Sequence, residues 1–117
     1  MTKAYSKRKL CRPVSHRVAL LRNLSTALIM NEKIKTTVPK AEELKKFLEN
    51  IITIAKSGKE KSYRKIQKDI NNKEAIKKLF DVIVPRYNER KGGYIQVFRI
   101  GTRKGDSAPM ALVRLIQ

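Results

Sequence analysis

Residues capable of acid–base or metal chemistry are few in this chain of 117 residues. His16 is the only histidine and Cys11 the only cysteine, and neither has an aspartate or glutamate near it in sequence. A histidine that acts as a base needs a neighbouring group to orient it, and two ligands are too few to hold a zinc ion. We therefore expect no catalytic site, no metal and no cofactor.

A second candidate for chemistry is the short glycine-flanked basic segment Gly101-Thr102-Arg103-Lys104-Gly105. Phosphate-binding loops of nucleotide-binding enzymes combine glycines with lysine, but their spacing differs and a helix follows them. Neither condition is met here. We interpret this segment as a loop whose Arg103 and Lys104 touch a backbone phosphate.

The dominant chemical feature is positive charge. Lysine and arginine total 28 against 10 acidic residues, a formal net charge of +18. Self-repulsion of this size opposes a compact state, and a polyanionic partner relieves it. Nucleic acid is the first candidate partner and an anionic membrane surface the second. The plain alternative is a charged surface that serves solubility alone.

The excess of positive over negative charge is most complete in residues 1–30, which contain no acidic side chain. We predict an extended basic arm over residues 1–14, which contains Lys7, Arg8, Lys9 and Arg12. Pro13 disfavours helix immediately before it. The arm is either a frayed terminus or a segment that becomes ordered when phosphates neutralise it. Its basic trio also matches a nuclear localisation signal, a pattern that many basic segments share.

A helix is expected from Ser15, a good N-cap residue, to about Asn31. His16 and Arg17 then occupy the first turn, where the helix dipole is already positive. A phosphate docked at this end would reverse that penalty. The expected buried stripe is Leu20, Leu21, Leu24, Ala27 and Leu28, with Arg22, Asn23 and Thr26 opposite.

The remaining elements follow from apolar spacing, and together they predict one domain over residues 15–117. Residues 33–37 read as a strand with Lys33 and Lys35 on its exposed face, where lysine either blocks edge pairing or contacts RNA. Helices are expected over 39–56, 60–70 and from Asn71 or Asn72 to Pro85. A basic loop, 86–93, leads to two strands, 94–100 and 109–116. This order predicts an α+β fold of two layers, with helices packed on a small mixed sheet.

Several other classes are disfavoured by the sequence. A single cysteine allows no internal disulfide, which suits a reducing compartment. No apolar run approaches the roughly 20 residues that span a bilayer, and the basic start lacks the apolar segment of a secretory signal. Organelle targeting is kept as a minor option. We expect no membrane partner and no small-molecule substrate.

An ordered set of motifs resembles the bacterial large-subunit ribosomal protein L17 family. The motifs run in family order from about Ser15 to the C-terminus. They are Ser15-His16-Arg17, Arg22-Asn23, Lys35 to Ala41, Leu79-Phe80, Pro85-Arg86-Tyr87, Gly92-Gly93-Tyr94 and Gly105 to Ala111. Each motif alone is weak, whereas the ordered set is highly specific.

The resemblance implies a structural protein of the large ribosomal subunit. It would bind large-subunit ribosomal RNA near the nascent-chain exit tunnel, beside other large-subunit proteins, in the bacterial cytoplasm. It would support translation and subunit assembly. The chain departs from the family at its start, Met1-Thr2-Lys3-Ala4-Tyr5, and at Ile95-Gln96, where the family often has threonine and arginine.

The candidate RNA-binding residues combine the arm, the first helix, the strand and the two basic loops. Most should contact phosphates, which position a protein without reading sequence, and RNA shape would supply recognition. The full candidate set is Lys7, Arg8, Lys9, Arg12, His16, Arg17, Arg22, Asn23, Lys35, Arg86, Arg90, Lys91, Gly92, Gly93, Arg103 and Lys104.

Two rival functions remain open on the sequence. A DNA-packaging protein would share the charge, and it would need an apolar wedge for which only Tyr5 or Leu10 of the arm could serve. A phosphate-handling enzyme would need an acid–base pair, and His16 has no evident partner. Preference for duplex DNA over ribosomal RNA would favour the first rival, and turnover abolished by His16→Ala would favour the second.

Overall fold

The computed structural model describes residues 14–116, so the predicted arm lies almost wholly outside the described part, together with Lys7, Arg8, Lys9 and Arg12. Helices and strands follow one another in the predicted order, with one helix and one strand first, then a run of helices, then two strands. They are α2 (Val14–Asn31), β1 (Lys33–Thr37), α3 (Val38–Lys56), α4 (Lys59–Asp69), α5 (Lys73–Lys78), the π-helical turn η1 (Leu79–Ile83), α6 (Val84–Arg86), β2 (Ile95–Thr102) and β3 (Pro109–Leu115).

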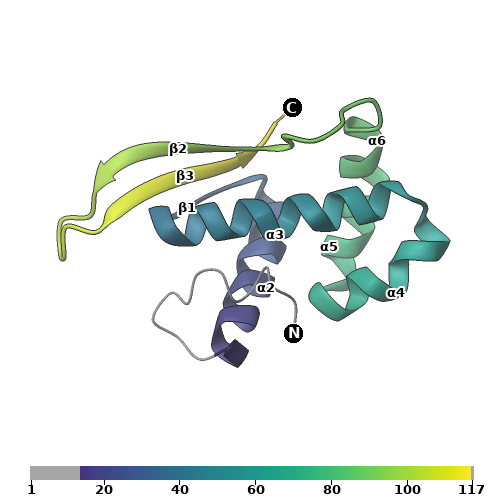
Figure 1. Ribbon diagram of the computed structural model, residues 1–117, viewed down its shortest axis with the longest axis horizontal. Coiled ribbons are helices and arrows are strands. Elements are labelled where there is room, and N and C mark those ends of the chain that lie inside the picture. Colours follow the sequence, from purple (N-terminus) through teal and green to yellow (C-terminus); the bar gives the residue numbers. More distant parts are fainter. Residues whose placement is uncertain (1–13, 117) are drawn as a thin grey trace.

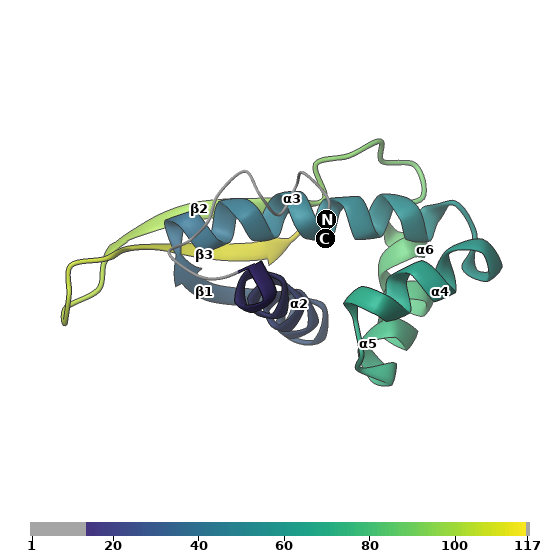
Figure 2. The ribbon, with the colours of Figure 1, turned by 60° about the horizontal axis from the view of Figure 1, so that its bottom comes forward.

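The sheet has the strand order β1-β3-β2, and both strand pairs are antiparallel. The α+β class with helices on a small sheet is thus confirmed, and the sheet is antiparallel throughout rather than mixed. Helix α3 runs along the sheet, α2 packs beside it, and α4 to α6 gather at the far end of α3 (Figures 1 and 2). Strand β3 is central because β1 and β2 both pair with it.

Helix α3 is the centre of the core, as its apolar spacing predicted. Its stripe Leu44, Leu48, Ile51, Ile52 and Ala55 is at most 3% exposed. Proline occupies its first turn after Thr37, an N-cap in extended conformation, and proline is tolerated there because that turn's amides lack helical partners.

Helix α2 is rotated relative to the prediction. It begins at Val14, so Ser15 lies inside the first turn rather than capping it. Its buried positions are Arg17, Leu21, Ser25, Leu28 and Ile29, whereas Leu20, Leu24 and Ala27 are only half-buried. The physical reason is tertiary: α2 packs against α3 and the sheet on one side and against α5 on another. This packing decides which face of α2 is buried, and it overrides the apolar stripe that the local sequence favours.

Defined capping residues mark the end of α3 and the starts of α4 and α5. The Asn72 side chain accepts hydrogen bonds from the amides of Glu74 (2.8 Å) and Ala75 (3.3 Å), so Asn72 rather than Asn71 caps α5. Gly58 precedes α4 at φ +128°, and its carbonyl accepts from the Ser62 amide at 3.1 Å. Ser57 is the C-cap of α3.

The fourth predicted helix, expected to end at Pro85, continues past this proline through a wider turn. Residues Leu79–Ile83 are π-helical, and the Val84 amide donates to the Leu79 carbonyl five residues back. Pro85 has no amide to donate, and it sits in the short α6, so helical geometry extends to Arg86. The apolar residues Ile76, Leu79, Phe80 and Ile83 of this segment, which repeat at helical spacing, are buried.

The β2–β3 hairpin extends beyond the body of the protein. Its strands run past the end of α3, and the turn lies far from every helix in both views (Figures 1 and 2). A bulge lies between Arg99 and Gly101, which sharpens local twist. Exposure rises along β2 from the buried Ile95 to the exposed residues after Val97. The hairpin therefore projects from the body of the protein as a two-stranded segment that is open to contact by a neighbouring molecule.

Candidate nucleic-acid interface

Four of the predicted contact residues lie on α2, and the structure separates them. His16 and Asn23 are exposed, Arg22 is partly exposed, and Arg17 is buried with 4% of its surface accessible. The burial of Arg17 follows from the rotation of α2, which places residues 17, 21, 25 and 28 on the packed face. Arg17 therefore does not belong to the exposed basic surface, and we leave it out of the contacts proposed below.

Arg22 and Asn23 border a hollow of about 320 Å³ between α2 and the α4–α5 connection. Asp69, Asn71 and Asn72 line its other side. The Arg22 Nε lies 3.6 Å from Asp69 Oδ1, and the two side chains are 38% and 26% exposed. Arg22 is thus paired in part within the protein, and it lines this hollow together with Asn23.

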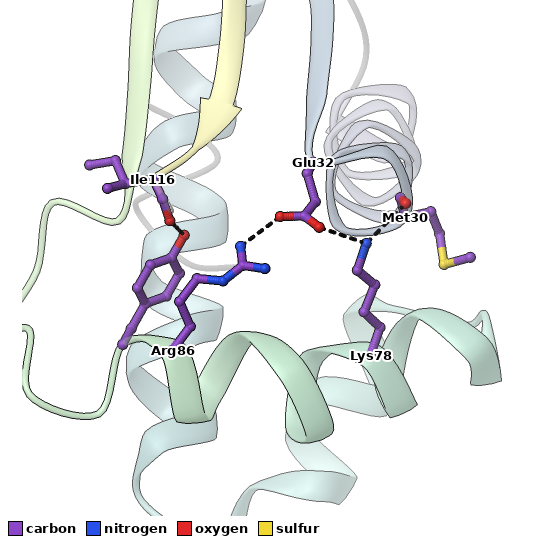
Figure 3. Close-up of polar contacts among 6 residues, drawn as sticks. Met30, Glu32, Lys78, Arg86 and Ile116 are labelled. Carbon is purple, nitrogen blue, oxygen red and sulfur yellow. Dashed lines mark hydrogen bonds and ion pairs between the residues drawn. The ribbon is translucent and has the colours of Figure 1, made fainter.

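Arg86, predicted to contact phosphate, is held by a carboxylate within the chain. Its Nη1 donates to Glu32 Oε1 at 2.6 Å, and Lys78 Nζ lies 3.2 Å from the other oxygen and 3.1 Å from the Met30 carbonyl. Figure 3 shows both cations reaching from the α5–α6 segment to Glu32, which lies between α2 and β1. We call Glu32, Lys78 and Arg86 the Glu32 clamp.

The Glu32 clamp is favourable electrostatically. The Arg86 hydrogen bond is the main cause that lowers the pKa of Glu32, and burial opposes it. In return Glu32 raises the pKa of Arg86. The side chains of Glu32, Lys78 and Arg86 are 27%, 24% and 22% exposed. Partial burial makes such charge-assisted hydrogen bonds stronger than surface pairs, so Arg86 serves the fold and is also left out of the proposed contacts.

Glu32 can form the clamp because of its backbone. It adopts the left-handed conformation, φ +65°, which ends α2. Its amide donates to the Leu28 carbonyl at 2.7 Å, and its carbonyl accepts from the Leu115 amide at 2.9 Å. Glu32 therefore ends α2, extends the backbone hydrogen bonding of the sheet and binds two cationic side chains.

The loop after α6 presents its basic side chains outward. Arg90 and Lys91 are exposed. The Arg90 carbonyl accepts hydrogen bonds from Lys56 Nζ and, at 3.4 Å, from the Tyr94 hydroxyl, which fixes the loop on α3. Gly92 and Gly93 have φ of +145° and +63°, conformations that side chains disfavour. The glycines thus shape a turn beside two exposed cations.

Aromatic packing holds the two ends of this loop together. The Tyr87 and Tyr94 rings lie 5.1 Å apart, tilted by 36°. The Tyr87 hydroxyl donates to the Ile116 carbonyl at the end of the sheet. Burial raises the pKa of Tyr87, so the hydroxyl stays a donor at neutral pH.

The hairpin turn carries two cationic side chains, Arg103, which is paired with an aspartate, and Lys104, which is exposed. Arg103 binds Asp106 through Nε (3.0 Å) and Nη2 (2.7 Å), both side chains about half exposed. Arg103 and the Ala108 amide lower the pKa of Asp106 to about 2. Lys104 is exposed, as is Lys35 on β1. A polyanion would meet Lys104 directly and Arg103 in competition with Asp106.

The predicted loops do not converge on one pocket. The loop of residues 87–93 lies beside α6 at one end of the molecule, and the hairpin turn lies at the other (Figure 1). Among residues 14–116, no cluster of three or more histidine, cysteine or acidic side chains could hold a metal ion. No helix in this part of the chain has the length and apolarity needed to cross a membrane. Such a distributed set of basic side chains suits an extended partner.

Comparison with known proteins decides the family. The ribosomal protein L17 family model matches residues 20–116. The chain belongs to the ribosomal protein L17 family. It is 51% identical over 116 residues to the large ribosomal subunit protein bL17 of Endomicrobium trichonymphae, covering 99% of both chains. It is 47% identical to the bL17 proteins of Aliarcobacter butzleri, covering 93% of this chain and 94% of the relative, and of Orientia tsutsugamushi (strain Boryong), covering 95% and 77%.

Family membership makes the chain a structural constituent of the large ribosomal subunit and not an enzyme. The resemblance inferred from the ordered motifs is therefore confirmed, and the phosphate-handling enzyme is excluded. The relatives are bacterial proteins, as the resemblance suggested.

Sequence reasoning missed the outward cluster on the sheet, where Phe98, Gln96 and Arg114 lie side by side. The Arg114 guanidinium lies 5.1 Å from the centre of the Phe98 ring, and its Nε donates to Gln96 Oε1 at 2.9 Å. The available signal was strand parity, because Gln96, Phe98 and Arg114 alternate with the buried positions of β2 and β3. Their adjacency depends on register, which no local pattern contains.

Proposed function

We propose that the protein binds large-subunit ribosomal RNA mainly through phosphate contacts, close to the nascent-chain exit tunnel, and so supports subunit assembly and translation in the bacterial cytoplasm. The observation that carries this proposal is the net charge of +18, displayed over several separated exposed segments of a small fold. Phosphate neutralisation relieves the repulsion among these cations. Neighbouring large-subunit proteins are its further partners.

The proposed contact residues are the exposed and partly exposed members of the predicted set, without Arg86, which the Glu32 clamp holds. On the described part they lie on α2, on β1, in the loop after α6 and in the hairpin turn. They are His16, Arg22, Asn23, Lys35, Arg90, Lys91, Gly92, Gly93, Arg103 and Lys104. Lys7, Arg8, Lys9 and Arg12 of the arm complete the set, on the expectation that residues 1–14 become ordered along the RNA.

The experiment is a salt titration of binding between the full-length protein and protein-free large-subunit ribosomal RNA. With six to ten phosphate contacts, affinity should fall by roughly 10³- to 10⁵-fold between about 50 and 200 mM salt. Competition by duplex DNA at matched salt tests selectivity for RNA. A flat salt profile, or preference for the duplex, would contradict the proposal.

Variants that each lack one positive charge test the individual contacts in the same titration. Lys91→Ala and Lys104→Ala should each reduce the slope of log affinity against log salt by about 1. Lys46→Ala is the charge-matched control, because this exposed lysine of α3 lies 3.9 Å from Glu43 and outside the proposed set. An equal loss in all three variants would mean that only net charge matters, and the assignment of contacts would fail.

The location near the exit tunnel needs an experiment in the assembled particle. Tagged protein should co-sediment with large subunits and leave them only at high salt. Chemical cross-linking within those subunits should join the protein to neighbours at the tunnel exit. Cross-links confined to another region of the subunit would overturn the location and leave RNA binding intact.

A further inference from the structure

The three strands present an outer face that no described helix covers. Along β3, Ala111, Val113 and Leu115 are buried, whereas Met110, Leu112 and Arg114 alternate with them. Alternate residues of a strand point to opposite faces, and α3 lies along one face of the sheet (Figure 2). The second set therefore points away from the core.

Register places six of the outer residues in two neighbouring rows across the strands. Lys33 of β1 pairs with Arg114 of β3, which pairs with Gln96 of β2. In the next row Lys35 pairs with Leu112, which pairs with Phe98. We call these six residues the sheet platform. Lys33, Lys35, Arg114 and Phe98 are exposed, and Gln96 and Leu112 are half-buried.

Phe98 and Arg114 form a cation–π pair on the β2–β3 side of the platform. Phe98 is 42% exposed, a large unburied area for an aromatic ring. The Arg114 guanidinium is 5.1 Å from the ring centre and is oriented by Gln96 at 2.9 Å. Aromatic rings and guanidinium planes on open sheets are surfaces on which unpaired RNA bases stack.

The charge of the platform favours a nucleic acid over a protein. The six platform residues include three basic ones, Lys33, Lys35 and Arg114, and no acidic one. A hollow of about 360 Å³ adjoins one end of the face, lined by Asn31, Glu32, Lys33, Arg114 and Leu115. Its one carboxylate, Glu32, is already neutralised by Arg86 and Lys78.

We infer that the sheet platform is a docking site for an unpaired segment of RNA. A base stacks on Phe98 beside Arg114, while Lys33 and Lys35 neutralise the flanking phosphates. This inference rests on the proposed function, and it adds to it a stacking site built from residues outside the predicted contact set, together with Lys35.

The test measures binding of full-length variants to protein-free large-subunit ribosomal RNA. Phe98→Ala should weaken binding by about 5- to 100-fold, the usual effect of removing one stacking ring, and Phe98→Tyr should retain it. Val82→Ala is the matched control, because Val82 is also 42% exposed and lies on η1, away from the platform. Thermal unfolding of each variant separates loss of contact from loss of fold.

The outcomes distinguish this inference from the proposed function. If Phe98→Ala binds as tightly as the wild type while wild-type binding stays steeply salt-dependent, the platform is wrong and the proposed function stands. If the wild type binds RNA without salt dependence, the proposed function itself fails. If Phe98→Ala keeps RNA affinity but loses incorporation during reconstitution of large subunits, the face docks a protein, and the assignment to RNA is overturned.

Discussion

The Glu32 clamp and the sheet platform use the same kind of side chain in opposite ways. Arg86 is 22% exposed and donates to a carboxylate at 2.6 Å, whereas Arg114 is exposed and lies against an aromatic ring and an amide. An arginine whose charge is met inside the chain joins elements of the fold. One that lies beside an exposed ring, with an uncharged amide as its hydrogen-bond partner, is available to an external anion.

The same contrast extends to the two ends of the molecule. Helix α3 and its neighbours contain the apolar core, while the projecting hairpin exposes Phe98 and Ile100 at 42% and 47%. Apolar burial is the dominant stabilising term in folding. Substitutions in the body should therefore change stability, and substitutions on the hairpin should change RNA binding.

The largest effect on stability is expected from Leu48→Ala in α3. Leu48 is fully buried, and truncation of such a side chain typically costs about 2–5 kcal/mol through lost transfer energy and the cavity left behind. Chemical denaturation measures this cost. Ile54→Ala on the same helix is the control, because Ile54 is 37% exposed and should cost much less. Similar losses at both sites would contradict the assigned core.

Glu32→Gln should have the next largest effect. The amide keeps the shape of the carboxylate but removes the charge that holds Arg86 and Lys78, and we expect a loss of about 1–2 kcal/mol in unfolding free energy. If Arg86 chiefly binds RNA instead, Glu32→Gln would leave stability unchanged.

The Glu32 clamp also predicts a pH dependence. The folded-state pKa of Glu32 is lowered from its usual 4.5, mainly by Arg86. A lowered carboxyl pKa contributes stability that is fully present above the unfolded-state pKa and is lost as pH falls through the folded-state pKa. Wild-type protein should therefore lose stability below about pH 4.5 more steeply than Glu32→Gln. Parallel acid curves would show that the clamp is not formed.

Asn72→Ala should cost about 1 kcal/mol, the typical loss of an N-cap side chain. The Asn72 side chain satisfies the amides of Glu74 and Ala75. Asn71→Ala is a matched control one residue away, since Asn71 is also exposed and was the alternative cap. A larger loss at Asn71 would reverse the assigned cap. Thermal melts followed by circular dichroism suffice.

The smallest effect on stability is expected at the hairpin turn. Asp106→Asn removes the acid that binds Arg103 on the exposed turn, and the thermal midpoint should not change measurably, because exposed ion pairs contribute little. Affinity for ribosomal RNA should rise by roughly two- to fivefold, because Arg103 no longer shares its charge with Asp106. Weaker RNA binding would mean that Asp106 orients Arg103 for its contact.

Sequence periodicity was sufficient for the elements and for much of the core. The stripe of α3 and the alternation of Ala111, Val113 and Leu115 encode burial directly, because side-chain direction within one element follows from its own geometry. Net charge and the ordered motifs were likewise sufficient for the family, since neither depends on how distant segments meet.

Tertiary structure alone decided which cations are inside and which are outside. Arg17 is buried because of how α2 packs, and Arg86 meets Glu32 from 54 positions away. The sheet platform likewise exists only through the register of three strands, two of which are separated in sequence from β1 by all the helices after α2. Local sequence sets the direction of each side chain within its element, but the partner it meets depends on packing between distant segments.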